Sequence, residues 1–268
     1  MFTINATMLL VGCGKMGSAL LQRTARDFTS CVVDPAAPSA SVKSLPGITW
    51  LASADKIDPG FKPDIVVIAI KPQHMAEIMP AYTRYKDSVF LSIAAGQTLA
   101  KLESFLGSGA HAIVRAMPNL PASNGQGMSV AVAGKNVTAG QKLLCEKLLK
   151  AVGEMAWVED ESWLDAVTAL SGSGPAYVFA LVEAMTKAGE LLGLPAVLAA
   201  QLARKTVIGS GALLAESAEN ASALRMAVTS PGGTTEAALK HLLGENGLPE
   251  LMNKAMQAAA GRAKDLAR

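Results

Sequence analysis

A glycine pattern near the start of the chain restricts the possible folds more than any other stretch. Gly12, Gly14 and Gly17 form G-x-G-x-x-G between a short apolar run and a stretch of helical periodicity. In a strand–turn–helix, the first glycine permits the tight turn, the second lets the backbone approach a pyrophosphate, and the third lets the helix pack on the strand. The helix N-terminus supplies N–H donors. The pattern predicts a dinucleotide-binding loop; the alternative is a tight turn that binds nothing.

Short apolar runs recur through the first part of the chain and alternate with helical patterns. Residues 65–70 are a continuous apolar run between two prolines, which is typical of a strand buried on both faces. Strands that alternate with helices predict βαβ units, so we expect an α/β fold with a doubly wound, mostly parallel sheet of the Rossmann type. The other predicted strands are 8–11, 31–33, 89–93, 112–117 and 129–133, with one near Trp50, and the predicted helices include 99–106 and 138–152.

The secondary structure that the sequence pattern predicts changes after about residue 160. Strand-like runs end there, and apolar residues between 181 and 192 recur at helical spacing. Alanine, a strong helix former, makes up 24 of the last 103 residues against 23 of the first 165. Many of these helical stretches are apolar on more than one face, which favours burial against another subunit. We therefore predict a dinucleotide-binding domain over 1–160 and an all-α substrate-binding and dimerisation domain over 161–268.

Charge and cysteine content exclude several classes of protein. The chain has 24 Lys and Arg against 22 Asp and Glu. This near-neutral balance predicts neither the basic surface of a nucleic-acid-binding protein nor a polybasic patch that binds membranes. Cys13, Cys31 and Cys145 form no CxxC pair and no zinc-like cluster, so we predict no metal site and no disulfide framework. The most apolar window is interrupted by the glycine-rich stretch 171–175, and the first residues lack a signal peptide's basic start. We expect a soluble, cytoplasmic protein.

An acidic residue stands where the dinucleotide pattern expects one. Asp34 follows the run 31–33 and lies 22 residues after Gly12. An acidic side chain at the end of the second strand binds the ribose 2′-hydroxyl, which favours NAD(H). The alternative is an aspartate that caps the turn before Pro35. No Arg or Lys follows until Lys43, so the residues lean towards NADH while both roles stay open.

Three further strand ends carry residues suited to a ligand, because ligands of doubly wound sheets bind at the carboxyl ends of the strands. Lys71 and Pro72 follow one strand, small residues at 94–96 follow the next, and Asn119 follows a third in a rigid loop between two prolines. The alternatives are a surface lysine and an ordinary proline turn. The predicted cofactor-binding residues are Gly12, Gly14, Lys15, Met16, Gly17, Asp34, Ala69, Lys71, Pro72, Ala94, Gly96 and Asn119.

Two loops of small and hydroxyl residues precede helices in the second part of the chain. Residues 171–176 read Ser-Gly-Ser-Gly-Pro-Ala, and residues 229–236 read Thr-Ser-Pro-Gly-Gly-Thr-Thr-Glu ahead of a helix expected to start near Ala237. A glycine-rich loop at a helix N-terminus binds anions, and four hydroxyls without a cation suit a small carboxylate. The alternatives are close helix crossing for the first loop and an elaborate helix cap for the second.

The chain shows no obvious acid–base or nucleophilic centre. It has no nucleophile elbow and no P-loop, and His74, His111 and His241 have no carboxylate at useful spacing. We assign each histidine a structural or surface role. A cofactor must then carry the chemistry while the protein orients it.

Five motifs in sequence order give the chain a family resemblance. They are Gly12-x-Gly14-x-Met16-Gly17, Ile70-Lys71-Pro72, Met117-Pro118-Asn119, the stretch 169–177 and the stretch 228–235. Together they closely resemble the pyrroline-5-carboxylate reductase family across essentially the whole chain. The last two motifs are specific to that family, whereas many dehydrogenases share the first.

The resemblance implies reduction of 1-pyrroline-5-carboxylate to L-proline, the last step of proline biosynthesis, with NADPH or NADH as hydride donor. It also implies helical domains through which subunits interlock as homodimers, which often assemble further into decamers. Many members carry Ser, Thr or Arg near the position of Asp34, which suits NADPH. Asp34 repels a 2′-phosphate, so the choice between NADPH and NADH stays open.

The substrate site is likewise implied by the resemblance. The loop 230–235 would hold the substrate carboxylate, Thr235 would be the catalytic residue that hydrogen-bonds the ring nitrogen, and the loop 171–175 would lie near the same pocket. Members often carry Glu-x-Pro ahead of this loop, whereas here Ala221 follows Glu219 and Asn220, so that match is partial. The implied substrate-binding residues are Ser171, Gly174, Ser230, Gly232, Gly233, Thr234 and Thr235.

Two other readings remain open. β-Hydroxyacid dehydrogenases share the glycine loop and a helical second domain, but they are similar to one another in a catalytic lysine soon after a glycine-rich helix start. Here no lysine follows that start until Lys187. A non-catalytic dinucleotide-sensing module needs the same glycine loop but has no use for the hydroxyl-rich loop 229–235.

Overall fold

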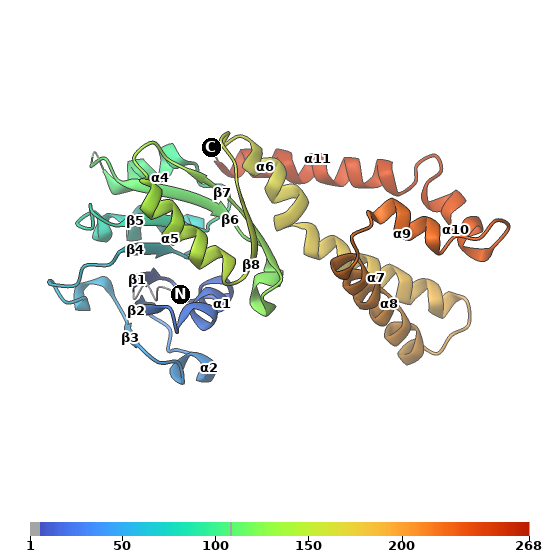
Figure 1. Ribbon diagram of the computed structural model, residues 1–268, viewed down its shortest axis with the longest axis horizontal. Helices are drawn as coiled ribbons and strands as arrows, with labels where there is room; N and C mark the ends of the chain where they lie inside the picture. Colours follow the sequence, from blue (N-terminus) through green and yellow to red (C-terminus); the bar gives the residue numbers. More distant parts are fainter. Residues whose placement is uncertain (1–5, 108, 268) are drawn as a thin grey trace. The chain divides into compact units, whose positions relative to one another are not determined.

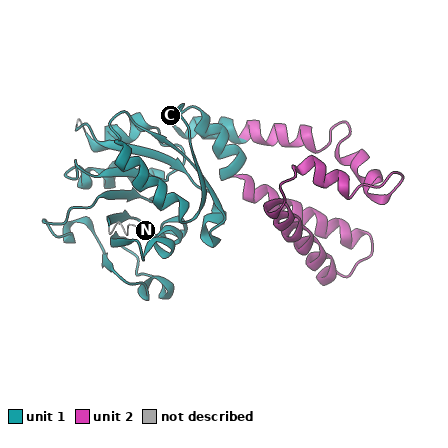
Figure 2. Ribbon diagram, viewed as in Figure 1, with its two compact units in different colours: residues 1–172, 259–268 teal, residues 173–258 magenta. Residues whose placement is uncertain are grey.

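The computed structural model describes residues 6–107 and 109–267 of the chain. They form two compact units (Figure 2). The sheet unit takes in the described residues up to Gly172 and again from Ala259 onward, and the helical unit is Ser173–Ala258. The chain therefore leaves the sheet unit at Gly172 and returns to it through its last helix.

One mixed sheet organises the sheet unit (Figure 1). Within the described ranges it has eight strands in the order β3-β2-β1-β4-β5-β6-β7-β8, and every neighbouring pair is parallel except β6 and β7. The predicted α/β fold with a mostly parallel sheet is confirmed. The strands are β1 (Ala6–Val11), β2 (Phe28–Val33), β3 (Ile48–Leu51), β4 (Ile65–Ile68), β5 (Val89–Ser92), β6 (Ala112–Met117), β7 (Gly127–Ala133) and β8 (Gly153–Trp157).

Two details of the strands differ from the sequence predictions. β8 is not predicted, because this edge strand is only partly buried and lacks the continuous apolar run by which the other strands are recognised. β4 ends at Ile68 rather than at residue 70. Ala69 and Ile70 continue instead in the turn beside Gly12, at the carboxyl edge of the sheet.

Helices cover both faces of the sheet. Successive residues of β1 point to opposite faces, so that Leu10 packs with residues of α1 and α5, while Leu9 packs with residues of α3 and α4. All four residues of β4 and of β5 are buried, as expected of strands covered on both sides. The helices of the sheet unit are α1 (Lys15–Thr24), α2 (Ala40–Lys43), α3 (Met75–Ile78), α4 (Leu99–Leu106), α5 (Ala139–Lys150) and α6 (Trp163–Val167).

A buried ion pair holds the chain where it leaves the sheet. The Nη1 atom of Arg115, on β6, donates to Oε1 of Glu161 at 2.8 Å, and the Arg115 side chain is only 5% exposed. The same Glu161 oxygen accepts from the backbone N–H of Leu99, at the start of α4, at 2.7 Å. Because one carboxylate serves both partners, α4, β6 and the segment leading to α6 are fixed together.

The helical unit contains almost no core of its own. Ala199 and Ala203 are its only buried hydrophobic residues, whereas Leu191, Leu192 and Val197 are each about four-fifths exposed. None of the helices in the described ranges is both long and apolar enough to cross a membrane. The helices of the helical unit are α7 (Gly174–Leu191), α8 (Ala196–Glu216), α9 (Ala221–Ala227) and α10 (Thr234–Leu242). The last helix, α11 (Leu248–Ala267), begins in the helical unit and ends in the sheet unit.

Candidate active site

The glycine loop lies between β1 and α1, at the point where the strand order reverses. Gly12 has φ +86°, and a Cβ there would lie 2.8 Å from Cγ2 of Ile70, so only glycine fits. A Cβ on Gly17 would lie 2.5 Å from the carbonyl oxygen of Gly12, so the third glycine lets α1 approach the loop. Gly14 is the N-cap of α1 and faces open space, with no atom within 4 Å of where a Cβ would stand. This loop has the shape that a pyrophosphate requires.

The Asp34 side chain ties the end of β2 to this loop. Its Oδ2 atom accepts a hydrogen bond from the backbone N–H of Cys13 at 2.7 Å, and its Oδ1 atom accepts one from the N–H of Ala36 at 2.8 Å. The second bond is the turn cap that was one of the two sequence alternatives. Each oxygen still has lone-pair capacity for a further donor, so the cap does not exclude ribose binding.

A hollow of about 600 Å³ opens beside the loop; we call it the Asp34 hollow. It lies at the carboxyl ends of β1, β2 and β4, where ligands of doubly wound sheets bind. It also contains His74, to which sequence reasoning assigned only a structural or surface role. Of the predicted residues, it brings together Gly12, Gly14, Asp34, Ala69 and Lys71.

A smaller hollow of about 250 Å³, the Asn119 hollow, lies on the other side of the glycine loop. It is lined by Lys15 and Met16 at the start of α1, by Ala95 after β5 and by Asn119 after β6. Two hollows that flank one glycine loop suit the two halves of a dinucleotide, and Lys15, Met16 and Asn119 belong to the predicted cofactor set. Pro72 and Ala94 follow β4 and β5 at the same edge but line neither hollow.

Asn119 joins two motifs that are far apart in the sequence. Its Nδ2 atom donates to Oγ of Ser171 at 3.1 Å, and its Oδ1 atom accepts from the backbone N–H of Met128 at 2.9 Å. A Cβ on Gly172 would collide with Cε of Met117, so the chain at 171–172 packs closely against the end of β6. The structure thus brings Ser171 into hydrogen-bond contact with Asn119, and the neighbouring Gly172 lines the Asn119 hollow.

The last helix reaches the carboxyl edge of the sheet at Gly96. This glycine has φ +68°, and a Cβ on it would lie 2.9 Å from Cβ of Leu266 in α11. Sequence reasoning placed Gly96 in the cofactor site because of its small size. The packing of Leu266 against it has no local sequence signal, because the two residues are far apart in the chain.

The loop 229–236 in the helical unit leads into α10. α10 begins at Thr234, three residues before the expected start, so Thr234 and Thr235 belong to the first helical turn. The backbone N–H of Gly232 donates to Oε2 of Glu236 at 2.8 Å, so a carboxylate already occupies one donor of the loop. Ser230 and Thr234 are exposed, and Thr235 is half-buried. Gly174 is the first residue of α7 and has nothing packed against it.

Burial makes the Cys13 thiol and the His111 ring unsuited to act as nucleophiles. Burial, with a smaller contribution from the charge of Asp34, raises the pKa of Cys13 to about 11. Its thiol therefore stays protonated at neutral pH, and thiolate is the reactive form. His111 is buried, and its Nε2 atom lies 3.1 Å from the carbonyl oxygen of Thr83. Among the described residues no cluster of His, Cys, Asp and Glu could hold a metal ion.

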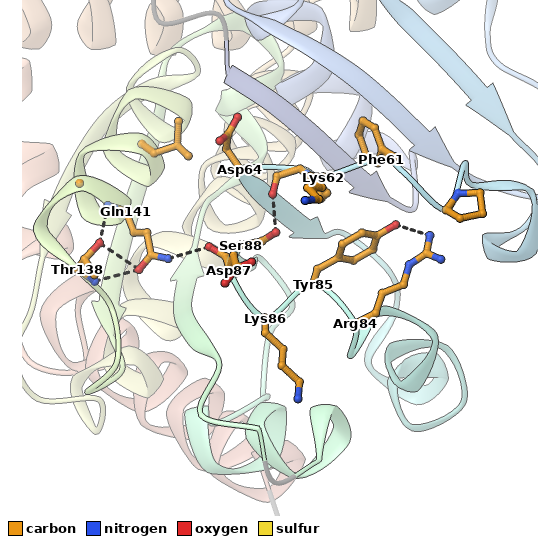
Figure 3. Close-up of a pocket in the computed structure, with 14 residues that line it drawn as sticks. Phe61, Lys62, Asp64, Arg84, Tyr85, Lys86, Asp87, Ser88, Thr138 and Gln141 are labelled. Carbon is orange, nitrogen blue, oxygen red and sulfur yellow. Dashed lines mark hydrogen bonds between the residues drawn. The ribbon is translucent and has the colours of Figure 1, made fainter.

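A second hollow of about 600 Å³ lies at the opposite, amino-terminal edge of β4 and β5 (Figure 3). Several of its polar side chains bond to one another or to the backbone. Arg84 donates to the Tyr85 hydroxyl at 2.6 Å, and Gln141 lies between Thr138 and the carbonyl oxygen of Asp87. Because no predicted site residue lines this hollow, the candidate site is the carboxyl edge.

Comparison with known families matches the two parts of the chain to two descriptions. A family model described as "Pyrroline-5-carboxylate reductase dimerisation" matches residues 161–266. A model described as "NADP oxidoreductase coenzyme F420-dependent" matches residues 7–96, which include the glycine loop and Asp34.

Similar proteins cover most or all of the chain. A pyrroline-5-carboxylate reductase of Pseudomonas aeruginosa is 44% identical over 76% of this chain and 75% of its own length, and one of Pisum sativum is 35% identical over 97% and 96%. The solved structure of a Coxiella burnetii pyrroline-5-carboxylate reductase has a TM-score of 0.88 at 34% identity, covering 98% of this chain and 99% of that one. A Plasmodium falciparum pyrroline carboxylate reductase with NADP bound has a TM-score of 0.83 at 27% identity, with the same coverage.

Proposed function

The chain belongs to the pyrroline-5-carboxylate reductase family, and from this premise we propose that it reduces 1-pyrroline-5-carboxylate to L-proline, the final step of proline biosynthesis, with NAD(P)H as the reductant. The observation that carries the proposal is the glycine loop at the reversal of the strand order. It lies between two hollows at the carboxyl edge, in a chain whose residues 161–266 match the family's dimerisation region.

The cofactor would bind along the carboxyl edge of the sheet. The open face of Gly14 and the N-terminus of α1 would take the pyrophosphate, with the Asp34 hollow for the adenosine half and the Asn119 hollow for the nicotinamide half. When bound, the reduced nicotinamide supplies the hydride. The predicted residues Met16, Gly17, Ala69, Lys71, Pro72, Ala94 and Gly96 follow the strands and turns at this edge, which supports their assignment to the same site.

The substrate would be held by the loop 230–235 and by the stretch 171–175. The hydroxyls of Ser230 and Thr234 suit a carboxylate, since they lie at the N-terminus of α10. The substrate carboxylate would take the place of Glu236 at the N–H of Gly232, and Gly233, whose N–H donates to the carbonyl oxygen of Ser230, would shape the turn. Ser171 and Gly174 would line the same pocket. Thr235 would accept a hydrogen bond from the protonated ring nitrogen and so keep the imine cationic, which makes its C5 carbon the better hydride acceptor. The rate gain would come mostly from positioning.

The helical part would serve as the dimerisation domain, over residues 161–268, beside a dinucleotide-binding domain over 1–160. On α8, Leu198, Leu202 and Leu213 recur at positions i, i+4 and i+15, and all three are exposed in the single chain. Such a stripe on a helix needs a partner surface, which supports a homodimer. We further propose cytoplasmic localisation and assembly of dimers into decamers, which light scattering of the purified protein would test.

The decisive experiment is the oxidation of NADH and of NADPH with pyrroline-5-carboxylate, followed by the loss of nicotinamide absorbance. We expect turnover with pyrroline-5-carboxylate and none with β-hydroxyacids. Oxidation of the reduced cofactor with neither substrate, despite cofactor binding, would instead support a dinucleotide-sensing module. Activity on β-hydroxyacids with the oxidised cofactor would support the dehydrogenase reading.

A further inference from the structure

We infer that this chain discriminates against the 2′-phosphate of NADPH and prefers NADH, and that the Asp34 carboxylate is the specificity-determining group. The inference rests on the proposed function and deepens it, because it names the cofactor of the same site. It depends on three features of the Asp34 hollow: where the carboxylate is fixed, what faces it, and which charges surround it.

The carboxylate cannot easily move out of the hollow. Its two oxygens accept from the N–H groups of Cys13 and Ala36 at 2.7 and 2.8 Å, and these donors belong to two different backbone segments. A side chain held from both sides keeps its position when a ligand arrives, in contrast to a flexible surface carboxylate. The Cys13 bond also fixes the carboxylate relative to the glycine loop, which sets where the ribose lies.

The free lone pairs of the carboxylate suit hydroxyl groups and reject a phosphate. An ionised carboxylate accepts about four hydrogen bonds, and here two are used by backbone donors. The ribose hydroxyls of NADH can donate to the remaining positions. A 2′-phosphate has no such proton to offer when it is doubly ionised, and it would bring about two negative charges towards the aspartate.

The surrounding charges do not compensate for that repulsion. The turn after β2, residues 35–39, contains no Lys or Arg, and Asp34 forms no ion pair with any residue that the structure describes. The hollow contains one lysine, Lys71, from the β4 side, and it also contains a second carboxylate, Glu77. The carboxylates of Asp34 and Glu77 outnumber the lysine, and this balance opposes the phosphate of NADPH.

The test measures binding without substrate, so that it does not depend on the reaction. Dissociation constants of NADH and NADPH, and of the fragments adenosine 5′-monophosphate and adenosine 2′,5′-bisphosphate, are determined by calorimetry. We expect the wild type to bind NADH about 10- to 100-fold more tightly than NADPH. Asp34→Asn removes the charge but keeps a side-chain oxygen, so this variant should bind NADPH more tightly while its affinity for NADH falls or stays the same.

A second variant adds a cation and leaves Asp34 in place. Ala36 is exposed and only its backbone N–H bonds to Asp34, so Ala36→Arg should raise the affinity for NADPH without breaking the turn. Asp58 provides the matched control. Its Oδ1 atom accepts from the N–H of Gly60 at 2.7 Å in the same two-residue turn, but it lies outside the hollow. Asp58→Asn should leave the ratio of the two affinities unchanged.

The outcomes separate the inference from its premise. Equal or tighter binding of NADPH by the wild type would overturn it. So would an Asp34→Asn variant that loses affinity for both cofactors equally, because Asp34 would then only support the turn. A protein that prefers NADH but does not reduce pyrroline-5-carboxylate would contradict the proposed function and leave the cofactor preference standing.

Discussion

The sheet unit and the helical unit are built on opposite principles. β4 and β5 are buried along their whole length, and the core of the sheet unit is filled by residues of the same chain. The helical unit buries only Ala199 and Ala203 and leaves long apolar side chains exposed on α7 and α8. The sheet unit is stabilised by apolar residues that it buries itself, whereas the helical unit exposes apolar residues as one side of a protein–protein interface does.

The largest expected effect comes from making the same substitution in both units. Leu10 is fully buried, so Leu10→Ala should lower the free energy of unfolding by about 2–5 kcal/mol. Leu191 is 79% exposed and lies in the helical unit, so Leu191→Ala should change the free energy of unfolding of the sheet unit by less than about 0.5 kcal/mol. Urea unfolding followed by tryptophan fluorescence measures both, because all three tryptophans lie in the sheet unit. Similar losses at the two positions would break the comparison.

The next effect is expected on the proposed homodimer rather than on the fold. Leu202→Asp places a charge in the middle of the exposed stripe of α8, so the dimer dissociation constant should rise about 100-fold or more. Gln201→Asp adds the same charge at the neighbouring exposed position, on a different side of the helix, and should have little effect. Sedimentation equilibrium distinguishes them. A Leu202→Asp protein that dimerises like the wild type would remove α8 from the interface.

A smaller effect is expected on catalysis, and it tests whether Thr235 of the helical unit takes part in the reaction while the sheet unit binds the cofactor. Thr235→Ala should lower kcat/KM about 10- to 100-fold, the value of one hydrogen bond to a charged group, while the affinity for the reduced cofactor is retained. Thr186→Ala makes the same change in α7, where the hydroxyl donates only to the carbonyl of Val182, and should leave kcat/KM unchanged. Wild-type kcat/KM in the Thr235→Ala protein would show that the assigned role is wrong.

The smallest expected effect is on thiol labelling. All three cysteines belong to the sheet unit, and burial raises the pKa of Cys13 to about 11 and of Cys145 to about 12, and also raises that of Cys31. A raised pKa leaves the thiol protonated at neutral pH, so alkylation of the native protein should be slow near pH 8 and faster as the pH approaches 11. Leu202→Asp should not change these rates. Faster labelling in that variant would mean that the sheet unit depends on the dimer.

The same contrast explains what could be predicted from the sequence. Strands such as 65–68 are recognisable because burial on both faces demands an unbroken apolar run. β8 has no such run because it lies at the edge of the sheet and is only partly buried. The start of α10 was expected near Ala237, because glycine and hydroxyl residues indicate a loop, although the first helical turn tolerates them.

The candidate site was predictable where it depends on local geometry. Gly12, Gly14 and Asp34 lie in one short strand–turn–helix–strand segment, and the structure brings them to one hollow. The bond between Asn119 and Ser171 spans 52 positions, and no periodicity or local spacing indicates it. The hydrogen bond from the N–H of Cys13 to Asp34 was also not evident from the sequence, because a backbone donor carries no residue-specific signal.

The return of α11 to the sheet unit has a consequence for the order in which the protein is made. Synthesis proceeds from the N-terminus, and domains generally fold as they emerge. Gly96 acquires its packing partner Leu266 only after residues 173–258 have been synthesised. The carboxyl edge of the sheet therefore stays incomplete on the ribosome until the whole helical unit has followed it. A nascent chain with all eight strands formed would still lack the helix end that packs against Gly96 at this edge.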